Sequence, residues 1–177
     1  MAIIKPFKGL RPRPDVAEKV ASRPYDVLSS EEARVEAKDN PYSFLHITKS
    51  EIDLPADIDI HSEMVYQKAK ESLDHFIAQK ILFPEDKPCY YIYELTMDGK
   101  SQTGLVCLSS VDDYVNDVIK KHEFTRPEKE KDRIDHMLAI KAQTGNVFLA
   151  YRDVEQLNKM IAVSLPRETG IRDVGNC

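Results

Sequence analysis

The sequence predicts an α+β fold in which a small mixed sheet packs with three or four helices. A hairpin turn, Asp98–Gly99, stands between two runs of β-forming residues. Residues 61–80 repeat apolar side chains with the period of an amphipathic helix. Two capping-box sequences, S-x-x-E and T-x-x-E, mark the starts of further helices. We expect one globular domain over residues 1–160, followed by a loose tail over residues 161–177.

The composition argues against several classes of protein. The chain has 177 residues, of which 42% are hydrophobic and 31% are charged, as in ordinary globular domains. Its net charge of -5 and the lack of a helix-turn-helix pattern argue against direct DNA binding. No apolar run approaches the ~18 residues that span a bilayer, and the start MAIIKPFKG lacks a signal peptide's apolar core. We therefore expect a cytoplasmic protein without membrane contact.

The N-terminal segment predicts an edge strand, a basic arm and a short helix. Ile3 and Ile4 can begin an edge strand, and the turn-rich sequence PFKGLRPRP that follows cannot be a helix. Ser29 and Glu32 have the spacing of a capping box, which predicts a helix over residues 30–38.

The next segment predicts a strand and the longest helix. In SFLHIT, apolar and polar residues alternate, which predicts a strand over residues 43–48. Residues 61–80 form a helix whose apolar face carries Val65, Ala69, Leu73, Phe76 and Ile77.

The second half of the chain begins with the hairpin over residues 88–108, centred on Asp98–Gly99. Val118 and Ile119 form an apolar strand pair. Residues 146–153, NVFLAYRD, read as the last strong strand, and residues 154–163 as a short helix.

The stretch KKHEFTRPEKEKDRIDH, residues 120–136, is the most informative part of the sequence. Thr125 suits the N-cap of a helix, and Glu128 three residues later completes a capping box. Pro127 fits the first turn, where its missing N–H costs nothing. We expect a helix over residues 126–143 that ends just before a glycine.

The charges on this helix are unevenly placed. Its period directs toward the core an apolar arc of Ile134, Met137, Leu138 and Ile140. Glu130 lies within that arc and Arg126 and Arg133 lie near its edge, whereas Asp132 and Asp135 point to solvent. Because unpaired buried ions are costly, these groups form either an internal ion-pair cluster or an anion site at the helix start. The spacing favours neither.

Further candidate residues come from the loops. Arg11 lies in the basic N-terminal loop, which could hold a phosphate, but an extended arm packed on the domain is favoured. Asp26 could act as a general base or metal ligand, but a turn residue that satisfies its own backbone is favoured. The sequence has no P-loop, and the spacing of His122, Glu123 and His136 disfavours a shared metal, so no metal site is predicted.

Five motifs resemble, in order from Ile3 to about Tyr151, the domain-of-unknown-function 1015 family. They are PFKGLRP, SRPYDVLSSEEA, FLHITKSEIDLP, the hairpin end QTGLV, and IKKHEFTRPEKEKDR. This is an uncharacterised bacterial and archaeal group that is often labelled SpoOJ/ParA/ParB-like. Its members are generally longer, so the resemblance implies that this chain is the N-terminal part of a longer architecture.

A more distant resemblance concerns the strand, polar turn and Arg-bearing helix start of the last motif. This arrangement is similar to the phosphate-binding box of the ParB/sulfiredoxin superfamily, whose members bind CTP or ATP. It implies a ParB/sulfiredoxin-like fold and a nucleoside triphosphate, with Mg²⁺, bound near Lys121, His122, Thr125, Arg126, Lys129 and Arg133. Glu123 or Glu130 would hold the metal or act as base. The box departs from the family pattern, because Thr125–Arg126 replaces a double arginine.

Two functions follow as expectations. The first is a nucleotide-dependent phosphotransferase or nucleotidase that uses these residues together with Arg11 and Asp26. The second is a non-catalytic nucleotide-sensing or interaction module, in which the same site binds a small anionic ligand and only changes conformation.

Overall fold

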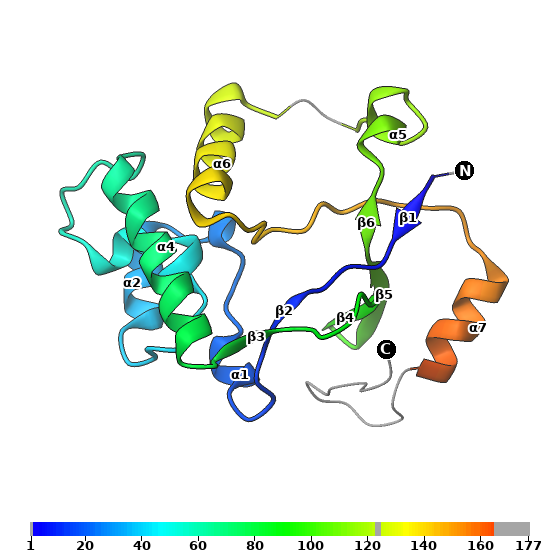
Figure 1. The fold of residues 1–177 in the computed structure, drawn as a ribbon, viewed down its shortest axis with the longest axis horizontal. Helices are drawn as coiled ribbons and strands as arrows, with labels where there is room; N and C mark the ends of the chain where they lie inside the picture. The colour runs from blue at the N-terminus through cyan, green and yellow to red at the C-terminus, as the bar shows by residue number, and fades with distance from the viewer. Residues whose placement is uncertain (1, 123–124, 165–177) are drawn as a thin grey trace. The chain divides into compact units, whose positions relative to one another are not determined.

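The computed structural model describes residues 2–122 and 125–164, which form two compact units (Figure 1). We call the first the helical unit; it comprises Arg11–Phe83 and Thr125–Gly145. We call the second the hairpin unit; it comprises the described residues of 2–10, 84–122 and 146–164. None of the described helices is long and apolar enough to cross a membrane.

The helical unit is built from five α-helices and two 3-10 turns. They are α1 (Ala17–Val20), η1 (Tyr25–Val27), α2 (Ser30–Ala37), α3 (Leu45–Thr48), η2 (Ser50–Asp53), α4 (Glu63–Ala78) and α6 (Pro127–Ile140). Helix α4 packs against α6, α3 and η2, so it is the centre of this unit (Figure 1). Strand β2 (Leu10–Pro12) pairs with β3 (Leu82–Pro84), and each of these strands contains a boundary between the units.

Two apolar clusters form the core of the helical unit. The larger consists of Val16, Val20, Ile47, Ala69, Leu73, Phe76, Ile81, Leu82 and Ile140. The smaller consists of Leu28, Ala33, Ala37, Leu45 and Ile52. The predicted apolar face of α4 is confirmed at four positions, Val65, Ala69, Leu73 and Phe76, whereas Ile77 is 40% exposed because the face ends with the last turn.

The capping box at α2 is confirmed. The Ser29 N–H donates to Glu32 Oε2 at 2.8 Å, and the Glu32 N–H donates to Ser29 Oγ at 3.2 Å. The helix then runs over Ser30–Ala37, close to the predicted range, because the signal is local and both partners lie within one turn.

The predicted strand over residues 43–48 is wrong, because this segment forms α3. Leu45 and Ile47 are fully buried and Thr48 is nearly so, which a strand with one solvent face does not allow. The Phe44 N–H donates to Val20 O at 3.0 Å, which ties the start of α3 to α1. Alternation over six residues does not separate a half-buried strand from a short buried helix, and here tertiary contacts decide.

The hairpin unit contains the predicted Asp98–Gly99 hairpin. Strand β4 (Tyr91–Met97) pairs antiparallel with β5 (Lys100–Val106), and Met97 lies opposite Lys100. Asp98 and Gly99 have φ values of 52° and 73°, which is the left-handed geometry of a type I′ turn. Strand β1 (Ile4–Lys5) pairs antiparallel with β6 (Leu108–Ser109), so the edge strand expected at Ile3–Ile4 is confirmed.

A close approach explains Gly9 in this unit. The Gly9 N–H donates to Tyr91 Oη at 2.6 Å, and the same hydroxyl donates to Phe7 O at 3.0 Å. A Cβ atom at position 9 would lie 2.8 Å from that oxygen. Only glycine therefore allows Tyr91 to bind the N-terminal arm in this way.

Two other predicted strands are wrong. Val118 and Ile119 follow α5 (Val111–Val115) in a turn, and residues 146–153 lie in no helix or strand. The helix predicted over residues 154–163 is confirmed as α7 (Glu155–Ser164). The chain is thus mixed α and β, as expected. Among the described residues, however, there are seven α-helices and three two-stranded sheets, in place of three or four helices and one mixed sheet.

Candidate functional site

Helix α6 starts and ends differently from the prediction. It begins at Pro127, and Arg126, not Thr125, is the N-cap, with φ -67° and ψ 129°. No side chain caps this end, so the predicted Thr125–Glu128 capping box is wrong. Proline favours an extended residue before it and the first helical position for itself, which moves the cap to Arg126. The helix ends where Lys141 adopts left-handed geometry, with φ 58°.

The buried face of α6 also differs. His136 and Ile140 are 3% and 4% exposed, and Asp132 and Arg133 are largely buried. Three members of the predicted apolar arc are exposed instead: Ile134, Met137 and Leu138. Glu130 is exposed as well. The helical period is thus correct, but the inward stripe carries polar groups that find partners on α3 and α4.

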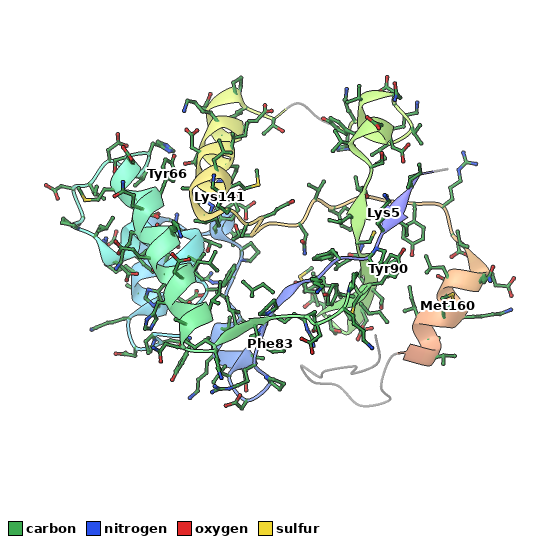
Figure 2. All side chains as sticks on the ribbon, viewed as in Figure 1. Lys5, Tyr66, Phe83, Tyr90, Lys141 and Met160 are labelled. Atoms are coloured by element: carbon green, nitrogen blue, oxygen red, sulfur yellow. The ribbon has the colours of Figure 1, made fainter. Side chains whose placement is uncertain are left out.

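Asp132 is the hub of these polar contacts. Tyr66, which projects from α4 (Figure 2), donates its hydroxyl to Asp132 Oδ1 at 2.8 Å. His61 Nδ1 lies 3.0 Å from the same oxygen, and Arg133 Nε donates to Oδ2 at 2.8 Å. Burial by itself would raise the pKa of Asp132, but the hydrogen bonds from Tyr66, Arg133 and His61 outweigh it, so the pKa is lowered. Burial and the bond to Asp132 raise the pKa of Tyr66.

Arg133 is held on two sides. Its Nε and Nη2 donate to Asp132, and its guanidinium lies 4.4 Å from the centre of the Tyr25 ring. Its third nitrogen, Nη1, is buried and has no hydrogen-bond partner in the described part of the chain. Ser62 Oγ, next to His61 in sequence, is the other buried side-chain atom there without a partner.

A second group of polar side chains surrounds Glu51, which is 6% exposed. Its Oε1 accepts from Ser30 Oγ at 2.7 Å and lies 3.0 Å from Lys49 Nζ. Arg34 donates to the carbonyl oxygens of residues 51, 52 and 54, at 3.0 to 3.2 Å, and so fixes the backbone that carries the carboxylate.

His136 lies within the electrostatic reach of both groups. Its Nε2 lies 3.0 Å from Ile47 O. Burial lowers the pKa of His136; the Arg133 charge lowers it further, and the Glu51 charge opposes this. We therefore define the polar cluster as the nine residues Tyr25, Ser30, Lys49, Glu51, His61, Tyr66, Asp132, Arg133 and His136.

The polar cluster brings together three of the sequence motifs that carry the family resemblance. SRPYDVLSSEEA contributes Tyr25 and Ser30, and FLHITKSEIDLP contributes Lys49 and Glu51. The last motif contributes Asp132 and Arg133. Motifs far apart in sequence thus supply side chains to two groups of contacts within the helical unit, and charges of both groups act on His136.

Of the residues predicted from sequence, Arg133 alone belongs to this cluster. Asp26 follows the cluster residue Tyr25 on η1 and is exposed. Arg11 is half-buried, 5.9 Å from the centre of the Phe83 ring. The other predicted residues of the helical unit are exposed and outside the cluster: Thr125, Arg126, Lys129 and Glu130.

The remaining predicted residues belong to the hairpin unit or lie outside the described residues. Lys121 and His122 are exposed in the hairpin unit, and Lys121 Nζ lies 4.8 Å from the centre of the Tyr114 ring. Glu123 lies outside the described residues. Within residues 2–122 and 125–164, no three His, Cys, Asp or Glu side chains are grouped so that they could hold a metal ion.

Sequence reasoning missed the other eight cluster residues. They come from four separate segments, and no spacing rule joins positions so far apart along the chain. The one available signal was that Asp132 is adjacent to Arg133. The helical period, however, had assigned Asp132 to the solvent face.

Comparison with known proteins supports the family and adds nothing on activity. The family model described as "Protein of unknown function (DUF1015)" matches residues 4–173. A search of curated proteins finds no match, and a search of solved structures finds none either. The ParB/sulfiredoxin likeness therefore gains no support. Because the family match covers nearly the whole chain, this protein belongs to the DUF1015 family, a family of proteins of unknown function.

Proposed function

We propose that the helical unit binds a small phosphorylated ligand and that Arg133 holds its phosphate. The observation that carries this proposal is the buried Nη1 of Arg133, which has no acceptor among the described residues. A buried donor without a partner costs about 1–3 kcal/mol, and more when it is charged. Phosphate and carboxylate oxygens are the acceptors that a guanidinium binds most strongly.

The rest of the guanidinium is already held in place. Asp132 takes Nε and Nη2, and Tyr25 covers one face of the group. A donor held in this way loses little side-chain entropy when a ligand binds, which favours affinity.

Two exposed cations on α6 favour a phosphate, whereas Glu128 and Glu130 in the first turn of the helix oppose it. Arg126 and Lys129 are exposed on the same helix, and neither has an ionic partner in the described ranges. Exposed cations of this kind raise the local concentration of an anion and speed its association, without contacting it directly. The more specific form of the proposal is a nucleoside triphosphate with Mg²⁺, as the likeness to the ParB/sulfiredoxin box implies.

A binding experiment with a conservative variant tests the proposal. The thermal unfolding of the chain is measured with inorganic phosphate, pyrophosphate, ATP and CTP, each with and without Mg²⁺. A ligand present at 100 times its Kd stabilises the wild type by about 2.7 kcal/mol. Arg133→Lys keeps a positive charge beside Asp132, but lysine has a single side-chain nitrogen and no counterpart of the free Nη1. We therefore expect this variant to lose the stabilisation by the ligand.

Arg126→Ala is the matched control. It removes an exposed arginine from the same helix and should weaken binding only slightly. If Arg133→Lys responds to the ligands like the wild type, the proposal is wrong. If Arg126→Ala loses the response and Arg133→Lys keeps it, the site is at the helix start instead.

A phosphate-release measurement on the same samples distinguishes two forms of this function. Release of phosphate from ATP or CTP would favour the phosphotransferase or nucleotidase. Stabilisation without release would favour the non-catalytic nucleotide-sensing module. If no ligand stabilises the wild type, the Asp132–Arg133 pair is an internal ion-pair network without a ligand.

A further inference from the structure

His61 and Asp132 have the geometry of a histidine–carboxylate dyad. His61 Nδ1 lies 3.0 Å from Asp132 Oδ1. The Asp132 side chain is 14% exposed, whereas that of His61 is 59% exposed. A carboxylate at Nδ1 keeps the proton on that nitrogen and leaves the lone pair on Nε2. The basic nitrogen of His61 therefore lies on an accessible side chain, while its orienting partner is nearly enclosed.

The dyad is anchored at both ends. Tyr66 and Arg133 both donate to Asp132, so the carboxylate cannot rotate freely. The backbone N–H of His61 donates to Asp59 Oδ1 at 3.0 Å, which fixes the chain that carries the ring. Such support keeps a catalytic side chain within the small tolerance that proton transfer requires.

Two unpartnered polar atoms belong to the residues that follow the two dyad residues in sequence. Arg133 Nη1 follows Asp132 on α6, and Ser62 Oγ follows His61 at the start of α4. These are the two buried side-chain atoms without a hydrogen-bond partner in the part of the chain that the structure describes. One is a charged donor and the other is a hydroxyl, which can both donate and accept. Phosphate oxygens can form hydrogen bonds with either kind of group.

We propose that His61 is a catalytic general base that activates water for the hydrolysis of a phosphate ester or anhydride. Asp132 is its positioning residue. This inference rests on the proposed function, because Arg133 must hold the phosphate beside the dyad. It assigns a reaction class to that site: hydrolysis with water as the acceptor.

The step balances without any further reactant. A water oxygen attacks phosphorus, and a new P–O bond forms while His61 Nε2 takes one proton of the water. The bond between phosphorus and the leaving oxygen breaks, and its electron pair stays on that oxygen. The proton on Nε2 then passes to the leaving oxygen, which yields an alcohol or a shorter phosphate and leaves His61 neutral.

The hydroxyl–carboxylate pair of Ser30 and Glu51 fits the role of a general base less well. Ser30 Oγ already donates to Glu51, and Lys49 lies beside the same carboxylate oxygen. The exposed His61 Nε2 has no hydrogen-bond partner among the described residues.

The first test measures the dyad without any ligand. The ¹⁵N shifts of the histidine side chains are compared in the wild-type chain and in Asp132→Asn. We expect His61 to carry its proton on Nδ1 in the wild type and to shift toward the other tautomer in the variant. A wild-type His61 protonated on Nε2 would overturn the inference.

The second test measures hydrolysis. The full chain is incubated with p-nitrophenyl phosphate, as an ester, and with ATP and CTP, as anhydrides, and product release is followed. We expect His61→Gln to lower kcat by about 10²- to 10⁴-fold, the usual contribution of a general base. Asp132→Asn should lower kcat as well. His75→Gln, which changes another exposed histidine on α4, should leave it unchanged.

The outcomes separate the two proposals. Ligand stabilisation without hydrolysis of any probe overturns the catalytic role of His61 and leaves the proposed binding function intact. Hydrolysis that His61→Gln does not slow overturns it too. If no ligand stabilises the chain and no probe is hydrolysed, both proposals fail.

Discussion

Replacing Asp132 by asparagine tests the energetic importance of the polar cluster. Asparagine keeps one oxygen for Tyr66 and His61, but its NH₂ group would face the two donors of Arg133. A hydrogen bond to a charged group contributes about 1.5–3 kcal/mol. Breaking a fully buried ion pair costs about 3–5 kcal/mol, but the Arg133 side chain is 29% exposed, so water compensates in part. We expect the free energy of unfolding to fall by about 2 kcal/mol at neutral pH.

The assay is urea unfolding followed by far-ultraviolet circular dichroism, at neutral and at acidic pH. The pKa of Asp132 is lowered in the folded state. Its carboxylate therefore stabilises the protein above the unfolded pKa of about 3.9, and this stabilisation is lost as pH falls through the folded pKa. The difference in the free energy of unfolding between the wild type and Asp132→Asn should therefore become smaller under acidic conditions.

Asp135→Asn is the control for this measurement. Asp135 lies on the same helix and pairs with Lys131, which is 76% exposed, so its loss should cost no more than about 0.5 kcal/mol. If Asp132→Asn and Asp135→Asn lower the free energy of unfolding equally, the reasoning is refuted. A gap that persists undiminished in acid would refute the role of the carboxylate charge.

Two further predictions concern α3. The ring nitrogen Nδ1 of His46 donates to the Asp53 carboxylate, 2.8 Å away, and this hydrogen bond raises the pKa of His46. The pair therefore stabilises the fold below about pH 6.5, and this stabilisation is lost as pH rises through the folded pKa. Asp53→Asn should therefore reduce the free energy of unfolding more at about pH 5.5 than at about pH 8.5; equal losses would contradict this. Leu45 is fully buried, so Leu45→Ala should cost about 3 kcal/mol in urea unfolding, and a loss below about 1 kcal/mol would contradict its place in the core.

The sequence predicted elements well where the determining interactions are local. The Ser29–Glu32 capping box and the Asp98–Gly99 turn each involve residues within four positions of one another. Backbone geometry and hydrogen bonds over such a short range depend mainly on the types of the neighbouring residues. The Thr125–Glu128 box of the same spacing does not form, because Pro127 moves the cap to Arg126. The apolar period of α4 is equally local, and it identified four of five buried positions.

The predictions failed where burial depends on a distant partner. The segment of α3 alternates like a strand, but contacts with α1 and α4 make it a buried helix. On α6, the apolar Leu138 is 60% exposed and the charged Asp132 is nearly buried. An apolar pattern cannot reveal this, because a carboxylate can be buried only if other segments supply its donors.

The candidate site shows the same difference between features set by one segment and features that need distant segments to meet. Arg133 was identified from its place in a charged helix start, which is a property of one segment. Asp132 and His61 were not, because their pairing requires α4 and α6 to lie side by side.

The sequence by itself therefore determined the capping box of α2, the hairpin turn, the family and one arginine of the candidate site. These depend on interactions between residues close along the chain, or on motifs read in order. Only the tertiary structure decided which face of α6 is buried and which side chains meet Asp132. The reason is physical: a polar group is buried when hydrogen-bond partners surround it, and these partners come from segments that the sequence lists far apart.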